Sequence, residues 1–266
     1  MQRFAQVLVF VLLGSPALAN EKIDRLAQAM HLPDVMEILV QEGQEHRKNL
    51  DETMLSNTGG ALFEAQVNDI YDPMWMQDHL TEAFETGMSD AQLDQAIVFF
   101  ESDLGQTIVT LENSARQAIS DPTIEEMARD AFEETARTTT RFALVEEYIE
   151  ANNLVEKNVQ GSLTSDYNFF RGLDVDSRAD TQDLLSELLS QKDSRTADTE
   201  AWLYAFLLLA YRPLDEAQMR ENIAFSRTET GQALNDALFD GFDRMFNDIS
   251  YQLGQAVARA LRASDL

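Results

Sequence analysis

The chain has 266 residues, of which 47 are acidic and 20 basic, so its formal net charge is −27. A surface this negative repels phosphate backbones and anionic lipid head groups, which excludes nucleic-acid binding as a leading function. The sequence contains no cysteine, and this excludes disulfides, thiolate metal sites and lipoprotein acylation.

The first residues predict an export signal. Arg3 supplies a positive start, Phe4–Leu13 forms an apolar stretch, and Ala17-Leu18-Ala19 has the small-x-small pattern of a cleavage site. The apolar stretch is shorter than the roughly 20 residues that cross a bilayer. We therefore expect residues 1–19 to be a signal peptide, and a periplasmic or secreted protein that starts at Asn20 and spans no membrane.

Helical periodicity runs through the rest of the chain, and strand alternation is almost absent. Asp72-Pro73 and Asp121-Pro122 each pair an N-cap residue with a proline at the first helical position. Further breaks are expected at Pro33, at Pro213 and in three polar stretches, namely Asn57–Gly60, Asn152-Asn153 and Gly172–Asp180. The sequence predicts an all-α fold.

One segment occurs twice. Met88–Phe99 followed by Gly105-Gln106 returns as Leu214–Phe225 followed by Gly231-Gln232, displaced by 126 positions without a gap. A weaker correspondence relates Ile23 and its successors to Phe142 and its successors at a displacement of 119. Self-similarity on this scale is typical of duplicated units. We expect a helical bundle of two tandem, diverged repeats, residues 20–140 and 141–266, with extra residues in the second.

The repeated segment also predicts its own local structure. Ser89 with Gln92 and Asp215 with Gln218 match the capping box that opens a helix. Ser102 and Thr228 each stand three positions before a glycine, which suggests a tight corner where a side chain would obstruct helix packing. Gln95 and Asn222 fall off the apolar stripe of their helices, so alanine at either position should be tolerated.

Three further helices are expected, two of which frame the second half. Apolar residues at alternating spacings of four and three predict one continuous helix from Ile124 to Ile149 and another from Leu234 to Ala260. Ala201–Tyr211 is almost wholly apolar and predicts a buried core helix. The long stripes favour an intramolecular bundle, with a coiled-coil dimer as the alternative.

No residue type forms a recognisable catalytic or metal-binding pattern. His31, His46 and His79 are scattered, and Asp174–Asp180 lacks the glycine and the final glutamate of a calcium loop, because Ala179 and Leu185 stand there. Those acids are expected to cap a helix near Thr181. We therefore assign no catalytic, cofactor-binding or metal-binding residue and expect a protein that is not an enzyme.

Two other groups have a structural and a functional interpretation. The carboxylate pairs could serve a glycosidase but are expected to be solvated; they are Glu125-Glu126, Glu133-Glu134 and Glu146-Glu147. An aromatic and methionine cluster could line an apolar groove but is expected to be core; its members are Trp75, Met76, Met54, Met74 and Met88.

The corner of the first repeat, Phe99-Phe100-Glu101-Ser102-Asp103-Leu104-Gly105-Gln106, resembles the F-[YF]-x-S-x-x-G-[KQ] signature of the bacterial domain-of-unknown-function family 2059. The second copy departs from it at Ser226 and Thr228. The resemblance implies an exported, all-helical protein of Gram-negative bacteria with no established activity, and it supplies no catalytic residues.

These observations favour a module of the cell envelope that acts by contact with another protein. The alternative is a protein that binds a small molecule or a lipid in a cleft between the two repeats. An exposed apolar patch would favour the first function, a large apolar cavity the second, and acidic residues converging in a deep pocket would favour catalysis.

Overall fold

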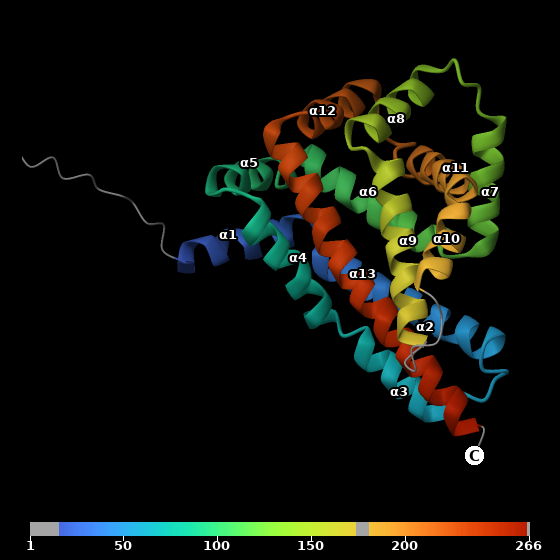
Figure 1. Ribbon diagram of the computed structural model, residues 1–266. Helices are drawn as coiled ribbons and strands as arrows, with labels where there is room; N and C mark the ends of the chain where they lie inside the picture. Colours follow the sequence, from blue (N-terminus) through green and yellow to red (C-terminus); the bar gives the residue numbers. More distant parts are fainter. Residues whose placement is uncertain (1–15, 174–180, 265–266) are drawn as a thin grey trace, which may run out of the picture.

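The computed structural model describes residues 16–173 and 181–264, and within them every regular element is an α-helix (Figure 1). This confirms the all-α prediction. The helices are α1 (Pro16–Ala29), α2 (Leu32–Thr53), α3 (Gly60–Ile70), α4 (Pro73–Gly87), α5 (Asp90–Phe100), α6 (Asp103–Ile119), α7 (Pro122–Glu134), α8 (Thr140–Ala151), α9 (Leu154–Leu173), α10 (Thr181–Ser190), α11 (Lys192–Ala210), α12 (Glu216–Ser226) and α13 (Glu229–Ser264).

Two predicted segments lie outside the described residues, namely the apolar stretch Phe4–Leu13 and the acidic loop Asp174–Asp180. The predicted cleavage site at Ala17–Ala19 falls within the first turn of α1. Among the residues that the structure describes, no helix combines the length and the apolar character needed to cross a membrane.

Most helix boundaries follow the local signals of the sequence. Asp72 and Asp121 cap α4 and α7, and a proline stands in the first turn of each helix. Both predicted capping boxes are present, at Ser89 for α5 and at Asp215 for α12. Side-chain acceptors thus satisfy backbone N–H groups that have no partner inside these helices.

The continuous helix predicted from Ile124 to Ile149 is wrong. The chain leaves the helix at Thr135, which has extended backbone angles, and Thr139 then caps α8 by accepting a hydrogen bond from the Phe142 N–H. Threonine side chains bond readily to nearby backbone groups and favour caps over helix interiors. The Arg137 guanidinium lies over the rings of Phe132 and Phe142 and holds the corner together.

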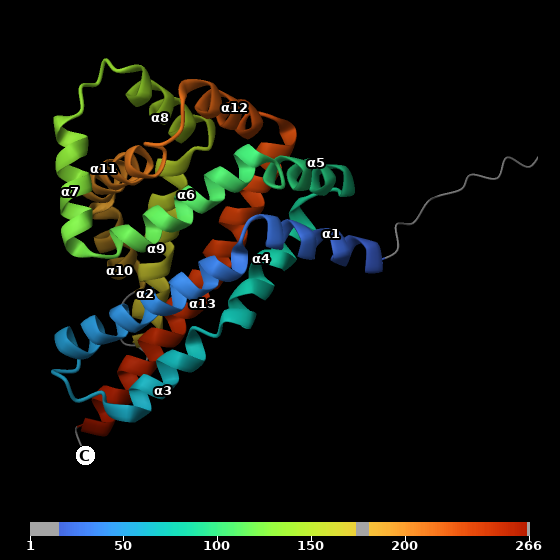
Figure 2. The same ribbon diagram turned by 180° about the vertical axis from the view of Figure 1, so that it is seen from behind.

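The C-terminal helix α13 runs through the whole molecule, with α3 and α4 along one side and α9 along another (Figures 1 and 2). Its apolar stripe is buried against these helices. The intramolecular bundle therefore accounts for the stripe. Small residues allow the close approach of α9: a Cβ at Gly254 would lie 2.1 Å from the Phe169 carbonyl oxygen, and one at Gly172 would lie 2.1 Å from that of Tyr251.

Two large hydrophobic cores divide the molecule, and each combines helices from both halves of the sequence. The first core joins residues of α1–α5 to Leu234, Met245, Ile249 and other residues of α13. The second joins residues of α8, α11 and α12 to Leu104, Ile108 and Ala115 of α6. Helix α6 of the first half thus completes the core of the second half, and helix α13 of the second half completes the core of the first half.

Matching hydrogen bonds fix the start of these two long helices. The Gln106 side-chain amide of α6 donates to the carbonyl oxygens of Ala29 (2.8 Å) and Phe100 (2.6 Å). The Gln232 amide of α13 donates likewise to Ala151 (2.9 Å) and Ser226 (2.6 Å). Each glutamine satisfies carbonyl groups at the ends of two helices, which have no partner inside those helices.

The two corners meet face to face. The Phe99 and Phe225 rings stack with their centroids 3.8 Å apart and an interplanar angle of 2°. Phe99 and Phe225 occupy the same position of the segment that occurs twice in the sequence. The two cores therefore join at the repeated segment itself.

We predict that alanine at Gly105 or Gly231 lowers the free energy of unfolding by about 1–3 kcal/mol. A Cβ would lie 2.2 Å from the Phe99 oxygen at Gly105 and 2.2 Å from the Phe225 oxygen at Gly231, so the helices would have to separate. Denaturant unfolding measures the change. Ser114→Ala on the exposed face of α6 is the control and should change stability by less than about 0.5 kcal/mol. A glycine variant that matches this control would contradict the packing role of its corner.

Candidate functional site

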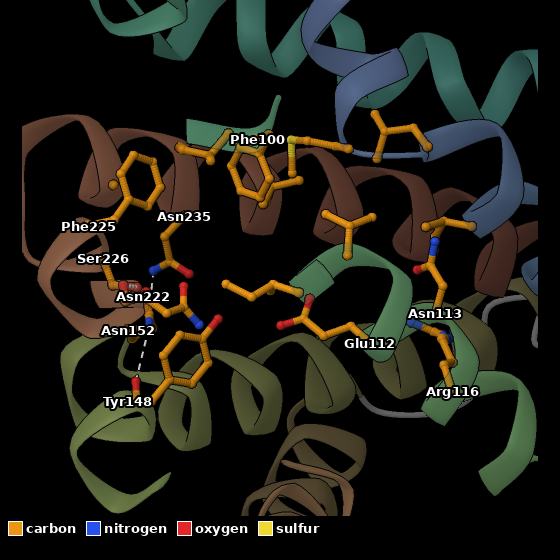
Figure 3. A pocket seen from close by; sticks show the side chains of 18 of the residues that line it. Phe100, Glu112, Asn113, Arg116, Tyr148, Asn152, Asn222, Phe225, Ser226 and Asn235 are labelled. Atoms are coloured by element: carbon orange, nitrogen blue, oxygen red, sulfur yellow. Dashed lines mark hydrogen bonds between the residues drawn. The ribbon is translucent and has the colours of Figure 1, made fainter. Parts of the chain in front are cut away.

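A cavity of about 280 Å³ lies between the two cores (Figure 3). Its wall combines residues from both halves of the chain, chiefly from α6, α12 and α13. The lining residues are Met30, Leu32, Val35, Phe100, Ile108, Val109, Glu112, Asn113, Arg116, Tyr148, Asn152, Phe206, Asn222, Phe225, Ser226, Gly231, Leu234, Asn235, Leu238 and Phe242. The volume is close to the lower end of the range for small-ligand sites.

Most of the wall is apolar. Aliphatic side chains of α2, α6 and α13 form much of it, and five aromatic rings complete it; the rings belong to Phe100, Tyr148, Phe206, Phe225 and Phe242. Figure 3 shows Phe100 and Phe225 on one side of the cavity, opposite Glu112 and Tyr148. A bound molecule would thus meet an aromatic surface on one side and polar groups on the other.

The polar groups form one connected cluster around Glu112. The Tyr211 hydroxyl donates a short hydrogen bond to the Glu112 carboxylate, and the Asn222 amide donates to the Tyr211 oxygen over 3.4 Å. The Tyr148 ring packs edge to face against Tyr211 at 5.5 Å between centroids. In Figure 3, the ends of Glu112, Tyr148 and Asn222 converge from α6, α8 and α12. This cluster gives the cavity a defined polar side.

Burial controls the ionisation of this cluster. Removal from water raises the pKa of the Glu112 carboxyl, although the hydrogen bond from Tyr211 opposes the shift. Burial, together with the nearby Glu112 charge, also raises the pKa of the Tyr148 and Tyr211 hydroxyls. Both tyrosines therefore remain neutral hydrogen-bond donors.

The other charged residue of the wall, Arg116, is already paired. Its guanidinium makes two hydrogen bonds of 2.9 Å to the Glu42 carboxylate and ties α6 to α2 at the partly exposed rim. Bidentate pairs of this kind are both strong and well oriented. Beside it, the Asn113 amide nitrogen is buried with no hydrogen-bond partner among the described residues. The rim thus offers a donor to an incoming group.

Asparagines hold the opposite end of the cavity. Asn235 of α13 donates to the Asn152 carbonyl oxygen (3.0 Å), and Asn152 donates to that of Tyr148 (2.9 Å). The Ser226 hydroxyl donates to the Asn222 backbone carbonyl oxygen over 3.1 Å. These bonds satisfy the ends of α8 and α12 and so fix the cavity wall.

The structure corrects one sequence-based expectation at this site. Asn222 was expected to be a tolerant, off-stripe position, but it is buried and contacts the Glu112 cluster. Asn222 lies off the apolar stripe because its side chain faces a polar patch inside the protein. In the sequence, this pattern looks the same as that of a side chain facing solvent. Glu112 was overlooked, although it follows the buried Ile108 by four positions and precedes the buried Ala115 by three. A carboxylate within an apolar stripe was the available signal.

The other residues considered from the sequence lie elsewhere. In the part of the chain that the structure describes, no three His, Asp or Glu side chains are placed to hold a metal ion. Glu125 and Glu147 pair with Arg129 and Arg227 at the surface. The aromatic and methionine cluster is mostly core, as expected, since Met76 and Met88 are buried; Met74 is the exception and is exposed.

The comparisons with known proteins identify a family for part of the chain. Residues 76–134 match the model of the family described as "Uncharacterized protein conserved in bacteria (DUF2059)". The match confirms the predicted resemblance over this segment, which contains α5, α6 and Glu112. It does not reach the second copy of the repeat, so membership of that copy stays a prediction. The searches of the curated proteins and of the solved structures gave no significant match.

We predict that Glu112→Gln stabilises the protein at neutral pH. Burial raises the folded-state pKa of Glu112 above its ordinary value of 4.5, so the carboxyl favours folding while protonated. This contribution is complete below the unfolded-state pKa and is lost as the pH rises through the folded-state pKa. The variant should therefore exceed the natural protein in stability near pH 7, and the difference should vanish in acid.

Unfolding of both proteins from about pH 4 to about pH 8 measures this difference. Glu133→Gln removes the same charge from an exposed position of α7 and is the matched control. Because its side chain is exposed, this variant should change stability by less than about 0.5 kcal/mol. A Glu112 variant that is less stable near pH 7 would show that the Tyr211 bond outweighs burial.

Proposed function

We propose that the protein binds a small, largely apolar molecule in the cavity between the two cores and is not an enzyme. The observation that carries this proposal is the wall itself, an apolar and aromatic surface opposed by a single polar cluster. Such a wall is typical of ligand sites, where apolar area supplies affinity and a few polar groups fix orientation. This was the alternative function considered from the sequence.

The polar cluster suits recognition better than chemistry. Its one carboxyl group is held by Tyr211, and its other groups are neutral hydroxyls and amides. General acid–base catalysis on a glycoside requires a pair of carboxyl groups about 5–10 Å apart across one site, and Glu112 is the sole carboxylate among the residues that line the described cavity. We therefore assign this cluster to orientation of a ligand.

We further propose that the chain arose by duplication and that the cavity lies between the two copies. Paired contacts support this: Arg25 of α1 binds Glu101 (2.6 Å), and Arg227 binds Glu147 of α8 (2.5 Å) with the charges exchanged. His31 and Asn153 both adopt a left-handed backbone, with φ of 52° and 49°. These pairs imply a displacement of 122 for the first helices (His31 to Asn153), in place of the 119 inferred from the sequence.

Contact with another protein of the cell envelope remains the second candidate function. A groove of about 700 Å³ between α7 and α11 supports it, because its lining is mostly apolar and Met127 is 66 % exposed. Arg141 and Arg212 also line it and would favour an acidic partner. Exposed apolar surface of this kind is characteristic of interaction sites. We propose a periplasmic or secreted location, in line with the predicted signal peptide.

We predict that a neutral fluorescent probe of apolar surfaces, N-phenyl-1-naphthylamine, enters the cavity and that Leu238→Trp reduces its affinity at least about tenfold. Leu238 is a partly buried wall residue of α13, so an indole there fills ligand space. Leu208→Trp makes the same change in the α7–α11 groove and is the control. Titration of the probe fluorescence measures both. Equal affinity in the two variants would contradict binding in the cavity.

We predict that a photo-crosslinker at Met127 captures one discrete protein partner in intact cells. The same crosslinker at Met74, which is 75 % exposed on α4, is the matched control for exposure. Comparable products at both positions would contradict a specific interface in the groove.

Accumulation of the uncleaved chain in the cytoplasmic fraction would contradict export.

A further inference from the structure

We propose that the ligand of the cavity is an organic ammonium ion, bound with its cationic head between the Glu112 carboxylate and the aromatic wall. This inference rests on the proposed function, because it names the class of molecule that the same cavity recognises. A quaternary ammonium ion with a short polar arm, such as choline, represents the class.

Charge is the first argument. Glu112 and Arg116 are the two charged residues that line the cavity, and Arg116 is neutralised by its bidentate pair with Glu42. The Glu112 carboxylate receives a hydrogen bond from Tyr211, and Arg116, the cation that also lines the cavity, pairs with Glu42 and not with Glu112. A buried carboxylate is costly unless it is paired. A cationic ligand supplies the missing partner, whereas a fatty acid or a phosphate would meet like charge.

The aromatic wall is the second argument. Five rings from α5, α8, α11, α12 and α13 line the cavity. The face of an aromatic ring is negative, so a cation within about 6 Å of its centroid is attracted, and this attraction grows when water is excluded. Rings combined with a carboxylate thus favour a cation over a neutral molecule of the same shape. An apolar ligand alone would gain nothing from Glu112.

The remaining polar groups match the rest of such a molecule. The Asn113 amide nitrogen, one position after Glu112 on α6, lacks a partner and can donate to a hydroxyl or carbonyl oxygen. The Tyr148 hydroxyl and the Asn222 amide also line the cavity and lie on the other side of Glu112 from Asn113 (Figure 3). A ligand oxygen near α6 would therefore be hydrogen-bonded while the ammonium head contacts the rings. Outside the cavity, the net charge of −27 raises the local concentration of cations.

The test compares choline with 3,3-dimethylbutan-1-ol, its neutral counterpart of the same shape, on the full chain by calorimetry or ligand-observed NMR. Choline should bind at least about tenfold more tightly than the alcohol, since a desolvated cation–π contact and a paired carboxylate each favour the charged head. Glu112→Gln should reduce this preference, since only the rings then favour the cation, while leaving the affinity for the alcohol unchanged. Glu133→Gln should leave both affinities unchanged.

Phe100→Leu provides a second variant in case the Glu112 variant fails to fold. It keeps an apolar wall but removes one ring, so choline binding should weaken and alcohol binding should not. Equal affinities of choline and the alcohol for the natural protein would overturn the ammonium inference and leave the cavity as a site for neutral ligands. Failure of the alcohol, of choline and of the naphthylamine probe to bind would instead overturn the proposed function.

Discussion

The structure depends on two helices, α6 and α13, each of which packs into the core of the other half of the chain. The apolar stripe of α6 completes the core built from α8, α11 and α12, and the stripe of α13 completes the core built from α1–α5. Apolar stripes of this length must be buried against other elements to stabilise a fold. Neither half of the chain can therefore close its core without the other. The cavity lies where the walls of the two cores come together, so it too requires both halves.

The corners that precede α6 and α13 set the directions in which these two helices leave. Gly105 and Gly231 let each long helix start against the backbone of the preceding residues, and Gln106 and Gln232 bind the carbonyl groups at the ends of two earlier helices. These bonds and close contacts leave little freedom in the angle at which α6 and α13 depart. Stacking of Phe99 on Phe225, of a kind worth about 0.5–1.5 kcal/mol beyond area burial, then sets the two corners against each other.

The features that the sequence predicted correctly are those that depend on residues close together in the chain. The caps at Asp72 and Asp215 and the corner at Ser102 follow from side chains that bond to backbone groups within three positions. The break at Thr135 was missed because the periodicity of apolar residues continues across it, while the caps that interrupt it are local and polar. The positions of Glu112 and Asn222 were missed for a different reason. Their role depends on contacts with Tyr211, which is 99 residues from Glu112 in the chain. A single sequence does not show that these residues are close in space.

The surface carboxylates and the buried Glu112 carboxylate have different effects on a cationic ligand. Most acidic residues lie on the surface, where salt screens their field beyond about 8–10 Å. They raise the concentration of every cation near the protein but do not distinguish one from another. Selection must come from a group that is shielded from water, and Glu112 is the carboxylate that faces the described cavity. Because burial raises its pKa, its charge is unfavourable in the empty site and becomes favourable when a cation enters. Such a cavity selects its ligand by charge as well as by shape.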